Sequence, residues 1–414
     1  MFWALMPLIC LLIAAAPSYS SMVRRGSDST PPAPTPTIHI RSVLPAAGGS
    51  EKSLIRLSAD GKLVATGNGH GPVRVWQIST GKLIAALDGT EGQSPRAFSP
   101  TNDRLLASAN LTSVSLYDLN SMRLRSRIAL DKLFGGLNLF GSFSPDGKEF
   151  LIFSENKVSL WRVDDGGLIA SQRCEGAAFR SQFSNDSQKV LTYCGGEKAV
   201  RLWDAGSGQA GLTFSSPTAV AVSVFSPDNQ TLATATLSGQ VLLWDVATGR
   251  IKKAWQGHGD LIFDAEFSPD GKTLATVSRD GTARLWDIEK MKPGGILRVG
   301  SESNHVVFSS DSKLLVVVGD GNRRDIRVWN IATAQPIWNF TGPQKKVLNV
   351  EFSPVGHLLV SSSEGSVNVW DLANGAHVAE LSQADFPANF SKDGKTLVTG
   401  GPKGSVMLWD VNAQ

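Results

Sequence analysis

Apolar and polar residues alternate along short runs of the chain, and turn-forming residues separate these runs. The clearest stretch begins with Leu261–Phe267 and continues through Pro269-Asp270-Gly271, where proline fixes φ and glycine accepts a positive φ. Two further alternating runs follow, Thr273–Ser278 and Thr282–Ile288, with Arg279-Asp280-Gly281 between them. A period of two residues predicts β-strands. We therefore expect three consecutive strands here and a fourth after a short connection.

This unit recurs nine times, and two columns of large apolar residues mark the copies. The first column ends the third strand of each unit, at intervals of 39–44 residues: Trp76, Tyr117, Trp161, Trp203, Trp244, Trp286, Trp329, Trp370 and Trp409. The second column lies 18–21 residues upstream: Leu57, Phe98, Phe143, Phe183, Phe225, Phe267, Phe308, Phe352 and Phe390. Because each large aromatic residue buries about 150–250 Å², the columns predict a core distributed over nine packed layers.

Nine units of four strands predict an all-β fold, a single β-propeller of about nine four-stranded blades, with eight or seven blades as alternatives. Residues 37–414 number 378, or 42 for each of nine units. The last unit has no fourth strand of its own, since the sequence stops five residues after Trp409. Thr37–Leu44 alternates and belongs to no earlier unit. We expect this segment to add to the last blade and close the ring, because an open edge would expose unpaired backbone groups.

The repeat resembles the WD40 family over about residues 37–414. The family's Trp-Asp dipeptide ends five units, as Trp203-Asp204, Trp244-Asp245, Trp286-Asp287, Trp370-Asp371 and Trp409-Asp410. The Gly-His dipeptide that the family has ahead of a unit's first strand is complete once, as Gly257-His258. The resemblance implies a structural hydrogen-bond network within one blade, made by His258, Ser278, Asp280 and Trp286. The other units lack the histidine, the aspartate or both, and we expect packing to hold their blades.

The first 36 residues lie outside the repeat. Phe2–Pro17 is almost wholly apolar and is followed by small residues, which is typical of a secretory signal peptide over residues 1–20. Two alternatives remain open, a short membrane anchor and a cytoplasmic protein whose translation starts at Met22. Residues 21–36 form a Pro/Ser/Thr-rich linker, and 37–414 form the propeller. We expect an exported protein, which is secreted, periplasmic or anchored to a membrane and facing outward.

Charge and cysteine content argue against several kinds of site. Forty Lys and Arg residues against 37 Asp and Glu leave a formal charge of +3, scattered along the chain, whereas a nucleic-acid binder usually carries a basic stripe. Cys10, Cys174 and Cys194 form no Cys-x-x-Cys pair, so neither a zinc site nor a disulfide framework is predicted. Cys174 maps to the outer strand of the third blade and Cys194 to the second strand of the fourth. We expect both to be free buried thiols.

No catalytic or cofactor motif is found. Gly271-Lys272-Thr273 and Gly394-Lys395-Thr396 lack the glycine that a phosphate-binding loop has five positions earlier. The six histidines are scattered along the chain without ligand spacing, and no Gly-x-Ser-x-Gly motif is present. We therefore predict no enzyme, no cofactor and no metal. Residues gathered from several blades around a central channel would leave no linear motif, so an enzyme or small-ligand binder acting there is the alternative.

The leading hypothesis is a non-enzymatic, monomeric scaffold that binds a protein or peptide, with an acidic partner as one option. A structural module in a larger envelope assembly is a further alternative. In relatives, the binding face most often carries the turns between second and third strands and the connections into the innermost strands. Arginine and lysine on such turns suit carboxylates. The candidate binding residues are Lys198, Arg279, Arg323, Arg324, Lys345, Lys346 and Lys403.

Overall fold

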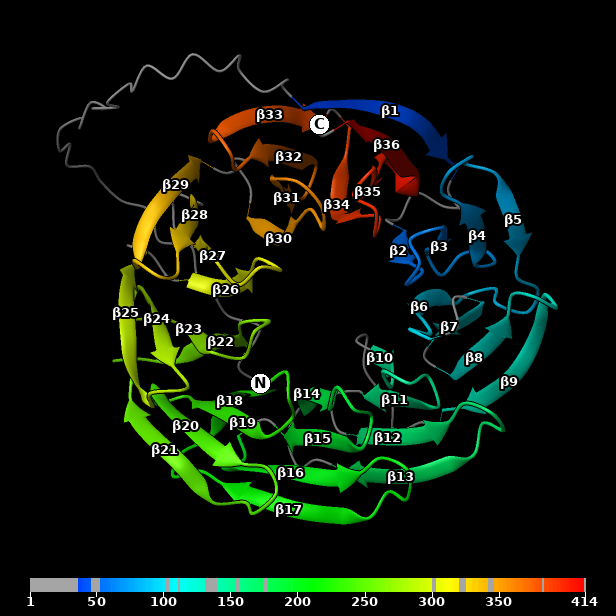
Figure 1. Cartoon of the computed structure of the whole chain (residues 1–414). Coiled ribbons are helices and arrows are strands. Elements are labelled where there is room, and N and C mark those ends of the chain that lie inside the picture. Colours follow the sequence, from blue (N-terminus) through cyan, green and yellow to red (C-terminus); the bar gives the residue numbers. More distant parts are fainter. Residues whose placement is uncertain are drawn as a thin grey trace, which may run out of the picture. The chain divides into compact units, whose positions relative to one another are not determined.

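The strands of the protein form nine blades around a common centre (Figure 1). The computed structural model describes residues 36–45, 53–101, 104–110, 112–130, 140–153, 157–173, 178–194, 196–299, 303–319, 325–341, 346–381 and 383–412. Within these ranges there are nine antiparallel four-stranded sheets, which confirms the prediction of nine blades over eight or seven. In the same ranges, no helix has the length and apolar character needed to cross a membrane.

Each blade contributes four strands in order from the centre outward. The innermost strands of blades one to nine are β2 (Leu54–Leu57), β6 (Ser94–Phe98), β10 (Phe140–Phe143), β14 (Ala178–Phe183), β18 (Val220–Phe225), β22 (Ile262–Phe267), β26 (Ser303–Phe308), β30 (Val347–Phe352) and β34 (Asp385–Phe390). The second strands are β3 (Leu63–Gly67), β7 (Leu105–Ala109), β11 (Glu149–Phe153), β15 (Lys189–Cys194), β19 (Thr231–Thr236), β23 (Thr273–Ser278), β27 (Leu314–Gly319), β31 (Leu358–Ser363) and β35 (Thr396–Gly400).

The two outer positions follow the same order. The third strands are β4 (Arg74–Gln77), β8 (Ser113–Asp118), β12 (Lys157–Arg162), β16 (Ala199–Asp204), β20 (Gln240–Asp245), β24 (Thr282–Asp287), β28 (Asp325–Asn330), β32 (Ser366–Asp371) and β36 (Val406–Asn412). The outermost strands are β5 (Leu83–Ala86), β9 (Arg123–Ala129), β13 (Leu168–Arg173), β17 (Ala210–Ser215), β21 (Ile251–Gln256), β25 (Lys292–Arg298), β29 (Gln335–Thr341), β33 (Ala376–Leu381) and β1 (Thr37–Leu44). A single 3₁₀ turn, η1 (Pro402–Gly404), joins β35 to β36 within the described part.

Antiparallel pairing within each blade defines two faces of the ring. The upper face, as we name it, carries the turns between second and third strands and the connections that lead into the innermost strands. The lower face carries the turns between first and second strands and those between third and fourth strands. Every blade therefore presents equivalent turns on the same face.

The ring closes as the sequence predicts, because β1 pairs antiparallel with β36 from Thr37↔Asn412 to Leu44↔Val406. The register shifts between Ile40 and Ser42, around Arg41. The guanidinium of Arg41 donates to Asp410 on β36 (Nε–Oδ1, 2.7 Å) and to the backbone oxygen of Ile78 in blade one (2.9 Å). One side chain thus joins the closing strand both to its own sheet and to the next blade.

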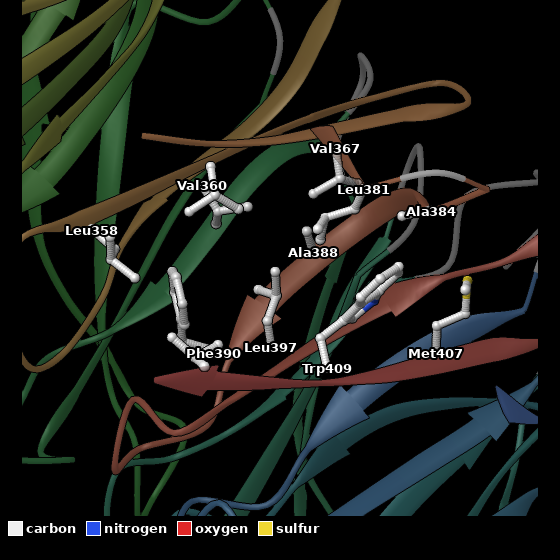
Figure 2. Close-up of a cluster of buried hydrophobic side chains, with 12 residues drawn as sticks. Leu358, Val360, Val367, Leu381, Ala384, Ala388, Phe390, Leu397, Met407 and Trp409 are labelled. Carbon is white, nitrogen blue, oxygen red and sulfur yellow. The ribbon is translucent and has the colours of Figure 1, made fainter. Parts of the chain in front are cut away.

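The core consists of apolar layers between adjacent blades, as the two columns predict. Figure 2 shows the layer between blades eight and nine, where Phe390 of β34 and Trp409 of β36 pack with residues of blade eight such as Leu358 and Val360. The layer between blades nine and one contains Leu44 and Trp76 and completes the circle. Because each blade packs on both faces, stability is spread around the ring rather than concentrated in one centre.

Wherever the structure describes it, the residue four positions after the Phe column, in the first turn of a unit, has a left-handed conformation. Glycine fills this position in units such as the sixth, where Gly271 has φ 71°. Ser312 adopts φ 59° at the equivalent place, and its hydroxyl accepts a hydrogen bond from the backbone N–H of Asp270 in the preceding blade (3.1 Å). Ser187 and Asn229 behave in the same way. In these units a side chain that links neighbouring turns offsets the strain of a non-glycine residue.

Cys194 corrects one expectation, because it is disulfide-bonded rather than a free thiol. It ends β15 and pairs in register with Ala178, the first residue of β14. Cys10 and Cys174 lie outside the described residues.

Candidate functional site

Blade six holds a buried hydrogen-bond network centred on His258. Its Nδ1 lies 3.0 Å from Oδ2 of Asp280, and its Nε2 lies 2.8 Å from Oγ1 of Thr276. The indole Nε1 of Trp286 donates to the same Thr276 oxygen at 3.0 Å. Burial lowers the pKa of His258, although Asp280 opposes the shift. Burial would raise the pKa of Asp280, but hydrogen bonds from Thr282 and Gly259 outweigh it and lower the pKa.

Ser278 does not take the place that the family resemblance implied for it. Trp286 pairs in register with Leu274, so its indole reaches the residue two positions further along β23, which is Thr276. The Ser278 hydroxyl instead donates to the backbone oxygen of Asp260 (3.1 Å) and accepts from the backbone N–H of Asp280 (3.1 Å). Ser278 therefore orders the turn before β24, and Thr276 provides the hydroxyl between histidine and tryptophan.

The indole–hydroxyl bond is not confined to blade six. Among the described residues it occurs in six blades, in the pairs Trp76–Thr66, Trp203–Thr192, Trp244–Thr234, Trp286–Thr276, Trp370–Ser361 and Trp409–Thr399. The hydroxyl always lies two residues after the strand partner of the tryptophan. We expected packing to hold the other blades, and the structure adds this bond to the packing. The network stabilises blades, and the imidazole of His258 at its centre is fully buried.

The candidate binding residues were chosen for the upper face, and the described ones lie there. Lys198, Arg279 and Lys403 are exposed in the turns before the third strands of blades four, six and nine. Lys346 is exposed in the connection into β30. They lie in four different blades and form no single cluster. Arg323, Arg324 and Lys345 fall outside the described residues.

One of these residues lines a pocket on the upper face between blades seven and eight. The pocket has a volume of about 250 Å³, and its lining is His305, Val318, Lys346, Val347, Leu348 and Asn349. Leu348 is 42% exposed, which is high for a leucine on an innermost strand. We call these six residues the blade 7–8 pocket. It joins a cationic side chain, an imidazole and an exposed apolar side chain in one place.

A larger cavity of about 800 Å³ opens on the lower face between blades four and five. Its lining includes Trp203 and Leu212, together with the ion pair between Lys189 Nζ and Asp204 Oδ2 (3.3 Å). Asp186 also lines this cavity, so its charged groups are one lysine and two aspartates.

Sequence reasoning missed a set of acidic residues on the innermost strands of blades six and eight. Asp264 Oδ2 lies 2.7 Å from Nδ1 of His305 in blade seven. Glu266 accepts a hydrogen bond from the backbone N–H of Phe308 (3.3 Å), and burial, assisted by the charge of Asp264, raises its pKa to about 7. Glu351 occupies the same position in blade eight, and burial also raises its pKa.

The signal for these residues was available, since Glu266 and Glu351 each directly precede a member of the Phe column. Glu351 accepts hydrogen bonds from the Asn389 side chain (2.8 Å) and the backbone N–H of Phe390 (3.3 Å). These carboxyl groups therefore bridge neighbouring innermost strands. Within the described ranges, no group of three or more His, Cys, Asp or Glu side chains is placed to hold a metal ion.

Comparison with known proteins agrees with this geometry. The WD40 family, described as WD domain, G-beta repeat, matches residues 210–245, 249–287, 334–371 and 376–410. Each match starts in or just before the outermost strand of one blade and ends on the third strand of the next. The matches cover blades five, six, eight and nine, in which the repeat is best preserved. The chain therefore contains WD40 repeats in four places within a nine-bladed β-propeller.

Three curated proteins illustrate the similarity. The Arabidopsis thaliana transcriptional corepressor LEUNIG_HOMOLOG is 28% identical over 183 residues, 44% of this chain and 23% of the relative. Autophagy-related protein 16 from the same plant is 26% identical over 250 residues, which are 58% of this chain and 48% of the relative. Transcription initiation factor TFIID subunit 5 of Caenorhabditis elegans is 27% identical over 195 residues, which are 45% of this chain and 30% of the relative. The matched regions thus span less than half of each relative's length.

Proposed function

We propose that the protein is a non-enzymatic scaffold that binds a protein or peptide partner on its upper face. The observation that carries this proposal is the blade 7–8 pocket, where exposed Leu348 lies beside exposed Lys346 on a wall of rigid strands. Interfaces commonly combine an apolar anchor with polar groups around it. Lys198, Arg279 and Lys403 extend the positive charge over the same face and favour an acidic partner.

The names of the similar proteins support a role in assemblies, since they include a transcriptional corepressor and a subunit of a transcription initiation factor. The contacts of the acidic residues support a non-enzymatic role, because Asp264, Glu266 and Glu351 accept hydrogen bonds from neighbouring blades. We propose a partner that is neither nucleic acid nor membrane, and a protein that is itself monomeric.

The test is affinity capture by the full chain and by matched variants, followed by mass spectrometry. Leu348→Asp and Lys346→Glu change the pocket, whereas Val355→Asp changes a residue that is 50% exposed on the lower face. Proteins captured by the wild type and by Val355→Asp, but lost with Leu348→Asp, would support the upper-face site. Equal capture by all four proteins would reject it.

We further propose that the protein is exported, with residues 1–20 as signal peptide, 21–36 as linker and 37–414 as the propeller. The apolar run Phe2–Pro17 supports export. The disulfide at Cys194 supports it independently, because disulfides persist in oxidising compartments and are rare in the cytosol. Sequencing the amino terminus of the mature protein tests this assignment. A first residue at Met22 would point to the cytoplasmic alternative, whereas cleavage near Ser20 would support export.

A further inference from the structure

Two arginines from neighbouring blades lie together at the inner edge of the ring, Arg56 on β2 and Arg96 on β6. Both residues are half-buried. Arg56 donates from Nε to the backbone oxygen of Arg96 (2.6 Å) and from Nη1 to the backbone oxygen of Ile55 (2.8 Å). The Nε of Arg96 is enclosed by protein and has no acceptor. The pair therefore combines two adjacent positive charges with unused hydrogen-bonding capacity.

The pair has no acidic partner, although other arginines of the described part of the structure do: Arg41 pairs with Asp410, Arg201 with Glu197 and Arg327 with Asp325. Among the residues that the structure describes, no carboxylate forms an ion pair with Arg56 or Arg96. Burial lowers the pKa of both guanidinium groups, and the charge of Arg56 lowers that of Arg96 further.

A guanidinium remains charged under all ordinary conditions, so it cannot escape the cost of burial by losing its proton. Buried charges in proteins are normally compensated by a partner of opposite sign. We propose that Arg56 and Arg96 form a binding site for a compact anionic group, a carboxylate or a phosphate. Such a group accepts hydrogen bonds from the planar guanidinium fork and supplies the missing negative charge.

The opposite side of the ring limits the size of the anion. Asp264 and Glu266 on β22 bring acidic residues to the inner edge across from β2 and β6 (Figure 1). An extended polyanion would approach these carboxyl groups and be repelled, whereas a single anionic group at the arginines would not. The distribution of charge thus favours a small anion or one acidic side chain, and disfavours a nucleic acid. This site does not depend on the upper-face scaffold proposed above.

The direct test is calorimetric titration of the full chain with sodium phosphate at constant ionic strength. We expect saturable binding by the wild type, and binding at least about tenfold weaker for Arg96→Gln, because that variant loses a charge-assisted contact. Arg96→Lys keeps the charge but not the fork and should give an intermediate affinity. Arg250→Gln, at an exposed arginine before β21, is the matched control and should bind as the wild type does. Absence of saturable binding by the wild type, or equal binding by Arg96→Gln, would overturn the proposal.

Thermal unfolding in phosphate-free buffer separates this role from a structural one. The Arg96 guanidinium donates no hydrogen bond to another described residue, and it is repelled by Arg56. Arg96→Gln should therefore leave the unfolding midpoint unchanged or raise it. A lower midpoint would contradict the proposal, because it would mean that Arg96 is already satisfied within the fold. Added phosphate should raise the midpoint of the wild type and of Arg250→Gln more than that of Arg96→Gln.

Competition distinguishes the two sources of the anion. Capped hexaglutamate and capped hexaglutamine are titrated into the protein in the presence of phosphate. If hexaglutamate weakens apparent phosphate binding and hexaglutamine does not, the site accepts an acidic side chain of a peptide. If phosphate binds and neither peptide competes, the site takes a free small anion. If Leu348→Asp and Lys346→Glu still captured their partner, the upper-face site would be rejected. The phosphate and peptide titrations would be unaffected by that result.

Discussion

Val317 lies beside Trp329 in blade seven, at the position that Thr276 holds beside Trp286 in blade six. Thr276 accepts a hydrogen bond from the Trp286 indole. Leu315 pairs with Trp329 in register, and Val317 lies two residues further along β27. Because valine has no hydroxyl, the buried indole Nε1 of Trp329 has no acceptor. Ile152 leaves Trp161 in the same state in blade three. Two blades thus lack a hydrogen bond that six others possess.

Val317→Thr should therefore stabilise the protein. Threonine has nearly the volume of valine, and its hydroxyl would satisfy an indole N–H that is already buried, for a gain of about 1 kcal/mol in the free energy of unfolding. The measurement is urea unfolding of the variant and the wild type. Val316→Thr is the control, since Val316 faces an apolar cluster on the other side of the strand and should lose stability. A loss of stability in Val317→Thr as large as in the control would show that the indole cannot use the new hydroxyl.

Thr276→Val should destabilise the protein more than Thr234→Val does. Thr276 accepts from Trp286 and also contacts His258 Nε2, whereas Thr234 accepts from Trp244 alone. Each buried polar group left without a partner costs about 1–3 kcal/mol. We expect the difference between the two variants to be about 1 kcal/mol or more in the free energy of unfolding. Equal losses would mean that the histidine contributes little to blade six.

The ring-closing strand gives a third prediction. Deletion of residues 1–45 removes β1 and exposes the unpaired edge of β36. The shortened protein should be cleaved faster by protease and should self-associate, because free sheet edges pair with other chains. Limited proteolysis and size-exclusion chromatography measure both effects. A point variant, Arg41→Ala, should show a smaller effect of the same direction, since it loses the contacts to Asp410 and Ile78 but keeps the strand.

Glu266 makes stability depend on pH. Its pKa is about 7 in the folded protein against an ordinary value of 4.5, so folding favours its protonated form. The stabilising contribution is complete below pH 4.5 and is lost as the pH rises through 7. Glu266→Gln should therefore gain stability relative to the wild type between pH 5 and 8, by about 2–3 kcal/mol. Glu91→Gln, at an exposed glutamate, should show no such trend in urea unfolding at each pH. A gain for Glu266→Gln that is independent of pH would contradict the assignment.

The regular features of the fold were predictable because they follow from burial. Trp286 and Phe267 have equivalents at the same spacing in the other units, and both are buried. Large buried side chains at a fixed spacing define the strands and the blades. The closing role of Thr37–Leu44 followed from the need to cover one edge. These inferences need only local periodicity and a count of strands.

The predictions from sequence failed where a contact depends on which residues lie opposite each other on neighbouring strands. Ser278 was predicted to bond Trp286, but Thr276 does so, because Thr276 lies two positions beyond the strand partner of Trp286. This register is set by a turn rather than by composition. The oxidation of Cys194 depends on which cysteine the fold brings next to it, and the spacing of cysteines along the chain does not reveal this. The acidic residues at the inner edge precede the Phe column in sequence, but their contacts with neighbouring blades depend on the packing of separate blades.

The pairing of Thr37 with Asn412 also constrains how the molecule is made. These partners are 375 positions apart (412 − 37), and every other blade is encoded between them. During synthesis, β1 emerges long before its partner β36 and cannot pair with it until then. Blades one to eight can assemble from contacts within and between adjacent units, but the ninth is incomplete until β36 has been synthesised. Completion of the circle is therefore the natural final step of maturation.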